Sequence, residues 1–131
     1  MGDYLIDRQR LLDIGCGESN FVGRVGSTPV EMVVGLDVSI EALRKLKSQD
    51  KRLLLVCADA QRLPFCAESF DLVFCMEVLE HLSRPQRAVT EIYGSLDVRG
   101  VVALSTPKFD ISFMRDFLIT VARRVIGYEI I

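Results

Sequence analysis

The stretch LLDIGCGES, residues 11–19, decides the fold. An apolar run interrupted by one acid, Asp13, ends directly at Gly15 and Gly17, with a single residue between the two glycines. Glycine adopts backbone angles that other residues avoid, and it lets a ligand approach the main chain closely. The stretch therefore predicts a buried strand that stops at a tight turn beside a ligand.

Four more apolar runs of strand length follow this one. Their hydrophobicity is nearly continuous rather than alternating, which is typical of strands that are buried on both faces of a parallel sheet. The five predicted strands are Leu11–Ile14, Met32–Leu36, Leu53–Ala58, Leu72–Met76 and Val101–Leu104.

Helical segments separate the strands. The clearest is Ser39–Ser48, with Ser39 as N-cap and an apolar stripe that includes Leu43. A second runs from Pro85 to Leu96, a third begins near Asp110, and only a short helix fits between Ser19 and Gly26. Strand and helix alternate throughout, so we expect one α/β domain over residues 1–131, with a doubly wound sheet and right-handed crossovers.

The composition excludes several classes of protein. With 16 Lys and Arg against 18 Asp and Glu, the formal net charge of the 131 residues is −2, which gives no support for general nucleic-acid binding. The four cysteines form no C-x-x-C pair, as expected for reduced thiols in the cytoplasm rather than for disulfides or a zinc site. We find no signal peptide and no apolar stretch long enough to span a membrane.

Acidic residues recur where the predicted strands end. Asp13, Asp37, Asp59 and Glu77 close four successive strands, and in a doubly wound sheet ligands bind outside these carboxyl ends. Carboxylates accept hydrogen bonds and repel anions, so the ligand should offer hydroxyl groups, other donors and positive charge. Asn20 stands where a dinucleotide-binding G-x-G-x-x-G motif needs its third glycine, which argues against NAD.

The chain resembles the class I S-adenosylmethionine-dependent methyltransferases, of the small-molecule type related to the ubiquinone-biosynthesis enzymes. Four motifs carry the resemblance over about residues 10–108: LLDIGCGES, VVGLDVS, CADAQRLPFCAESFDLVFCMEVLEHL and GVVALSTPK. It implies a Rossmann-like sheet of five mainly parallel strands in the order 3-2-1-4-5, with helices on both faces. It also implies S-adenosylmethionine as cofactor, S-adenosylhomocysteine as product, and methyl transfer to a small molecule, with oxygen favoured as the methylated atom.

The resemblance also implies roles for individual residues. The backbone of the glycine loop would approach the methionine part of the cofactor, and Asp13 would orient its ammonium group. Asp37 would accept hydrogen bonds from both ribose hydroxyls, and Asp59 from the adenine amine. The implied cofactor-binding residues are Asp13, Gly15, Cys16, Gly17, Asp37, Val38, Asp59, Ala60, Cys75 and Met76.

The stretch Glu77-Val78-Leu79-Glu80-His81 leaves three interpretations open. If a helix starts at Glu77, then Glu77, Glu80 and His81 share one face. His81, the sole histidine, is the candidate general base for a hydroxyl acceptor. The three side chains are also weak candidates for a Mg²⁺ site, as in some relatives. In the simplest interpretation, Glu77 closes the cofactor pocket while Glu80 and His81 brace the loop that leads into Pro85.

The chain differs from the family's usual pattern after the fifth strand. Relatives continue into an antiparallel hairpin at the sheet edge, whereas this sequence ends at Ile131. We therefore expect the hairpin to be missing and the fifth strand to form an open edge, through which a homodimer could assemble. The alternative to an active enzyme is thus a fragment that binds the cofactor without catalysis and dimerises through this edge.

Overall fold

The computed structural model describes residues 10–18, 23, 30–105 and 128–129. The predicted helix after Asp110 lies outside these residues, as does most of the one between Ser19 and Gly26. The elements are β1 (Arg10–Ile14), the 3₁₀ turn η2 (Cys16–Glu18), β2 (Met32–Asp37), α2 (Ile40–Gln49), β3 (Leu54–Cys57), β4 (Phe70–Met76), the 3₁₀ turn η3 (Leu79–His81), α3 (Pro85–Ser95), β5 (Leu96–Ser105) and β6 (Tyr128–Glu129).

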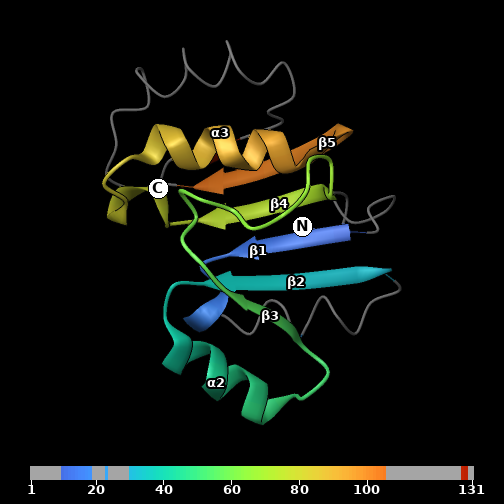
Figure 1. Ribbon diagram of the computed structural model, residues 1–131, viewed down its shortest axis with the longest axis vertical. Coiled ribbons are helices and arrows are strands. Elements are labelled where there is room, and N and C mark those ends of the chain that lie inside the picture. The colour runs from blue at the N-terminus through green and yellow to red at the C-terminus, as the bar shows by residue number, and fades with distance from the viewer. Residues whose placement is uncertain (1–9, 19–22, 24–29, 106–127, 130–131) are drawn as a thin grey trace.

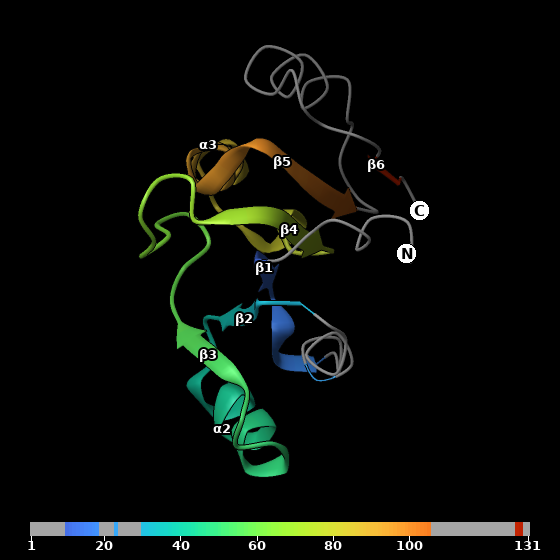
Figure 2. The same ribbon diagram turned by 90° about the vertical axis from the view of Figure 1, so that its right-hand side faces the viewer.

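One sheet contains all the strands, in the order β3-β2-β1-β4-β5-β6, and every pair in it is parallel. The five predicted strands and their order 3-2-1-4-5 are confirmed. In Figure 1 the arrowheads of β1, β2, β4 and β5 point to the same side, so their carboxyl ends form one rim of the sheet. Figure 2 shows how strongly the strands are fanned by the twist of the sheet.

The fifth strand is not the open edge that the sequence predicted. At its carboxyl end Leu104 pairs with Tyr128 and Ser105 with Glu129, so β6 covers these two positions. The strand is also longer than the predicted run, because it starts at Leu96 directly after α3. The covering strand is parallel, so every strand pair in the described residues is parallel.

Two apolar cores lie on opposite faces of the sheet. Successive strand residues point to opposite faces, so Leu11 joins the core under α2 whereas Leu12 joins the core under α3. Leu43 and Leu46 are the buried residues of α2, and α3 buries five, among them Val89 and Ile92. The burial of both faces explains why the strand sequences show no alternation.

The two described α-helices begin for reasons visible in the sequence. In α2 the side chain of Ser39 accepts a hydrogen bond of 3.2 Å from the N–H of Ala42, which confirms the predicted N-cap. Helix α3 begins with Pro85, whose fixed φ and missing N–H suit the first turn. Its capping residue, Arg84, makes no side-chain capping bond. Within the described residues, no helix is long and apolar enough to cross a membrane.

Candidate functional site

The strand order reverses between β1 and β4, and Gly15 lies at this crevice, directly after β1. Its φ is +77°, and its N–H donates a hydrogen bond of 2.7 Å to the carbonyl of Leu36 in β2. A Cβ on Gly15 would lie 2.5 Å from Cγ2 of Val78, which follows β4. Both the backbone angle and the space therefore require glycine here, at the position where doubly wound sheets bind their ligands.

The second glycine of the loop contacts the acid that ends β2. The N–H of Gly17 donates to Oδ2 of Asp37 at 2.9 Å, and the N–H of Ser39 donates to Oδ1 at 2.8 Å. A Cβ on Gly17 would lie 2.7 Å from both Oδ2 of Asp37 and Cβ of Ala42. The glycine loop and the acidic end of β2, predicted to act together, are thus joined directly. Each oxygen of the Asp37 carboxylate accepts one N–H and can therefore accept a hydrogen bond from one further donor.

Asp13, in β1, and Cys16, in the glycine loop itself, are both buried. Asp13 is only 5% exposed, within a parallel strand rather than on the open rim. Burial, together with the nearby negative charges of Asp13 and Asp37, raises the pKa of the Cys16 thiol to about 12. A thiol with this pKa is protonated at neutral pH, so the buried side chain of Cys16 packs in the core and is not a nucleophile. Any contribution of Cys16 to binding must come from its backbone.

The candidates after β3 form a separate part of the rim. The backbone of Ala58 donates to the carbonyl of Asp37 at 3.0 Å, which places this segment beside the end of β2. Val38 is 75% exposed and Asp59 is exposed, whereas Ala60 is buried. The exposed side chain of Val38, after β2, and the exposed carboxylate of Asp59, after β3, thus follow neighbouring strands of the sheet.

The two candidates at the end of β4 differ in exposure. Met76 is 43% exposed and can contact a ligand through its side chain. Cys75 is fully buried among the apolar side chains beneath α3, and burial near Asp13 and Glu80 raises its pKa to about 12. The side chain of Cys75 therefore packs in the core next to the end of β4 and is not exposed at the rim.

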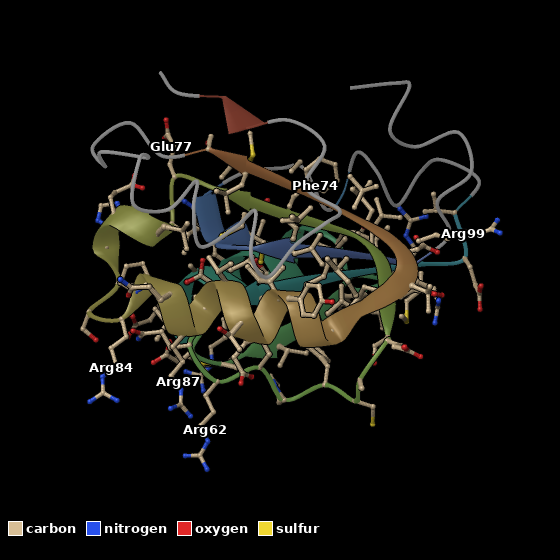
Figure 3. All side chains as sticks on the ribbon, turned by 90° about the horizontal axis from the view of Figure 1, so that it is seen from above. Arg62, Phe74, Glu77, Arg84, Arg87 and Arg99 are labelled. Atoms are coloured by element: carbon tan, nitrogen blue, oxygen red, sulfur yellow. The ribbon has the colours of Figure 1, made fainter. Side chains whose placement is uncertain are left out.

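The predicted shared face of Glu77, Glu80 and His81 is wrong. Glu77 has a φ of +57°, and the following 3₁₀ turn covers only Leu79–His81, so no α-helix starts at Glu77. Glu77 is exposed and its N–H donates to the carbonyl of Ser105, whereas the side chain of Glu80 is 6% exposed and that of His81 is 73% exposed. Figure 3 shows Glu77 at the rim of the sheet.

A metal site is not formed by these residues. Nε2 of His81 lies 3.7 Å from Oε1 of Glu80, and among the side chains that the structure describes no group of three His, Cys, Asp or Glu is placed to hold a metal ion. Oε2 of Glu80 is buried without a hydrogen-bond partner. The arrangement leaves His81 accessible beside a buried acid.

Sequence reasoning missed two residues of this rim. Val78 packs against Gly15, and nothing in its residue type indicates that contact. Gln61 hydrogen-bonds to Asp59, and the signal that could have revealed it is the spacing Asp-x-Gln, because Asp side chains commonly bind the backbone two residues further on.

A hollow elsewhere on the surface contains none of the candidates. Its lining includes Val30, Glu31, Arg52 and Leu54, at the amino ends of β2 and β3. The rim with the predicted site lies at the opposite ends of these parallel strands. We therefore base the site on the glycine loop and its contacts.

Comparison with known proteins agrees with this geometry. Residues 12–104 match the family described as "Methyltransferase domain". The chain belongs to this methyltransferase family. The prediction of the class I S-adenosylmethionine-dependent methyltransferases is therefore confirmed, and with it the family's cofactor, S-adenosylmethionine.

Two curated relatives show the extent of the match. The chain is 33% identical over 108 residues to a biotin biosynthesis bifunctional protein of Cellvibrio japonicus, covering 79% of this chain and 21% of that protein. It is 32% identical over 102 residues to a malonyl-[acyl-carrier protein] O-methyltransferase of Legionella pneumophila, covering 75% and 36%. The chain thus spans about a third or less of the curated relatives it matches.

A solved methyltransferase shares the fold. An amino pentose methyltransferase from Micromonospora echinaspora, solved with S-adenosylmethionine bound, superposes with a TM-score of 0.73 at 23% identity. The match covers 82% of this chain and 47% of that one. The chain thus shares the fold of about half of that methyltransferase.

Proposed function

We propose that this domain binds S-adenosylmethionine across the carboxyl ends of β1, β2 and β3 and transfers its methyl group to a small-molecule acceptor, at oxygen. The observation that carries the proposal is the contact between Gly17 and Asp37. It joins a loop that only glycine can form to a half-buried carboxylate with acceptor capacity to spare.

The residues present fit this cofactor. When bound, it supplies an activated methyl group on a sulfonium. A side chain at Gly15 or Gly17 would meet Val78 or Asp37, so the loop can pack against the ends of β2 and β4 only with glycine at these positions. Asp37 accepts from the ribose diol, exposed Val38 covers the adenine, and Asp59 accepts from its amine. Buried Asp13 in β1 adds negative charge that favours a cationic ligand.

Methyl transfer requires mainly that donor and acceptor be held in line. A hydroxyl acceptor must also lose a proton, and we assign its removal to His81, which is accessible and lies beside Glu80. The choice of oxygen is supported by the O-methyltransferase among the relatives. His81→Asn should lower turnover while leaving the affinity for S-adenosylhomocysteine unchanged.

Ligand-induced stabilisation tests the binding step. S-Adenosylhomocysteine should raise the melting temperature of the full chain, and Asp37→Ala should abolish the shift. Glu41→Ala, which removes an exposed acid from the first turn of α2, is the matched control and should keep the shift. Absence of any shift with S-adenosylmethionine and S-adenosylhomocysteine would sink the proposal.

A second candidate function is a cofactor-binding module that dimerises without turnover. The observation in its favour is the edge of β5, which β6 pairs only at Leu104 and Ser105 in the part of the chain described here, while Val98 is 55% exposed. It predicts a dimer by light scattering and binding without methylation of any acceptor. A monomer that methylates a phenol or a carboxylate would exclude it.

A further inference from the structure

Gln61 uses its side-chain amide to hold the carboxylate of Asp59. Its Nε2 lies 3.2 Å from Oδ1 and 3.2 Å from Oδ2 of Asp59, and its backbone N–H donates to Oδ1 at 2.8 Å. The backbone N–H and the side-chain amide of Gln61 thus both hydrogen-bond to the carboxylate of Asp59, which is exposed to solvent. An exposed Asp without such contacts would rotate freely.

The other end of the same amide is also held. Oε1 of Gln61 accepts a hydrogen bond of 2.6 Å from the N–H of Arg84 and one of 3.2 Å from the hydroxyl of Ser83. Arg84 is the capping residue of α3 and makes no side-chain capping bond of its own. Gln61 therefore supplies an acceptor at this helix start, and the orientation of its amide is fixed from both sides.

The backbone of Gln61 is fixed as well. Its carbonyl accepts a hydrogen bond of 3.1 Å from Nε of Arg87. Figure 3 shows Arg62, Arg84 and Arg87 extending from the same side of the molecule, around the start of α3. Gln61 thus attaches the segment after β3 to the beginning of α3, and the N–H of Leu63 donates to Glu91 further along this helix.

These contacts leave the two oxygens of Asp59 unequal. Oδ1 receives two N–H groups, one of them at 2.8 Å, whereas Oδ2 receives only the longer contact from Nε2 of Gln61. A carboxylate oxygen has two lone pairs, so Oδ2 is the oxygen with an acceptor position to spare.

We propose that Gln61 is a positioning residue that presents Oδ2 of Asp59 to the 6-amino group of adenine and so sets the preference for adenine over a 6-oxo purine. This inference rests on the proposed function, because it takes Asp59 as the acceptor for the adenine amine. The 6-amino group of adenine can donate a hydrogen bond to Oδ2. The 6-carbonyl oxygen of hypoxanthine is itself an acceptor, so it cannot bond to the carboxylate, and binding of the hypoxanthine compound is weaker. Loose rotation of Asp59 would weaken this discrimination.

Calorimetric titration of S-adenosylhomocysteine and of S-inosylhomocysteine, which carries hypoxanthine, tests the inference. The wild type should prefer the adenine compound by at least about tenfold. Gln61→Met keeps the length of the side chain but removes its polar atoms, and it should reduce this ratio by about fivefold. Gln49→Met, at the end of α2 and at the opposite end of β3, is the matched control and should leave the ratio unchanged.

A double substitution separates positioning from a general loss of structure. Asp59→Ala should remove most of the preference, and adding Gln61→Met to it should change the ratio no further, because Gln61 acts through Asp59. If Gln61→Met alone keeps the wild-type ratio, Gln61 has no positioning role, whatever happens to the melting temperature. If the wild type binds neither compound, the proposed function fails instead.

Gln61→Glu provides a second variant if Gln61→Met does not fold. It sets a second carboxylate against Asp59 and should weaken S-adenosylhomocysteine at pH 8, where both groups are charged. Affinity should recover towards pH 5, because one of two adjacent carboxyl groups then takes up a proton and can again donate to the other. Equal affinity at both pH values, with the wild-type purine ratio, would overturn the inference.

Discussion

The N–H of Gly17 donates a hydrogen bond of 2.9 Å to Oδ2 of Asp37, across 20 residues of sequence. The other oxygen of the same carboxylate accepts from Ser39, the N-cap of α2. One side chain therefore fixes the glycine loop after β1 and the entry to the helix after β2. Asp37 is predicted to serve both the stability of the fold and the binding of the cofactor.

Asp37→Asn separates these two contributions. The amide keeps one acceptor, so one of the two backbone N–H groups loses its partner, and the free energy of unfolding should fall by about 1–2 kcal/mol. Urea denaturation measures this change. Glu41→Gln, which neutralises an exposed acid at the second residue of α2, should change the same quantity by less than about 0.5 kcal/mol. Equal stabilities for both variants would show that the Gly17 contact contributes nothing.

Gly15→Ala tests the requirement for glycine at the crevice. A φ of +77° costs a residue with a Cβ about 1–2 kcal/mol, and the contact with Val78 adds to that cost. Adding Val78→Ala removes Cγ2, so the double variant should regain part of the lost stability in urea denaturation. The matched control is Gly94→Ala in α3, where a Cβ meets no atom within 4 Å. It should stabilise the protein by about 0.5–1 kcal/mol, and a similar loss at both glycines would contradict the argument.

The sequence was sufficient to predict the sheet and the position of its acids. Continuous apolar runs identify strands buried on both faces, and the carboxyl ends of parallel strands meet at one rim, so the rim positions of Asp37, Asp59 and Glu77 follow from pattern alone. How deeply each acid is buried was not predictable. Asp13 is enclosed and Glu77 is exposed, because burial depends on neighbouring strands and loops rather than on spacing along the chain.

The errors in the prediction concern backbone conformation and distant pairing. Helical spacing placed Glu77, Glu80 and His81 on one face. The φ of Glu77 is in the left-handed region, so no α-helix starts at this residue. Such conformations in residues other than glycine are uncommon, and no residue pattern identifies them reliably. The pairing of β6 with β5 joins residues more than twenty positions apart, for which a two-residue strand gives no periodic signal.

An ion pair at the amino ends of the strands provides a third prediction. Nη2 of Arg10 lies 2.9 Å from Oδ2 of Asp97, and the backbone N–H of Arg10 donates to Asp71, so β1, β4 and β5 are joined. Arg10→Gln should lower the free energy of unfolding by about 1 kcal/mol, because the side chain of Arg10 is 31% exposed and its charge is only partly screened by solvent.

Salt dependence and a second arginine provide the control for Arg10. In 1 M NaCl the difference between wild type and Arg10→Gln should shrink, since salt screens the attraction. Arg52, whose side chain is 89% exposed, pairs with Asp50 at 3.0 Å, and Arg52→Gln should leave the free energy of unfolding nearly unchanged. A loss at Arg10 no larger than that at Arg52 would show that the three-strand connection is not stabilising.

The four cysteines should divide into two reactive and two protected thiols. Cys57 and Cys66 are exposed, so a disulfide reagent at pH 8 should modify two thiols rapidly in the folded protein and four after denaturation.

Burial raises the pKa of Cys75 from 9.0 to about 12, so the unfolded chain loses this proton at a lower pH than the folded protein does. The free energy of unfolding should therefore fall as the pH rises from about 9 towards 12. Cys75→Ala should reduce that slope by about 1 kcal/mol per pH unit in urea denaturation. Cys66→Ala should leave the slope unchanged, and identical slopes for all three proteins would show that Cys75 does not titrate with unfolding.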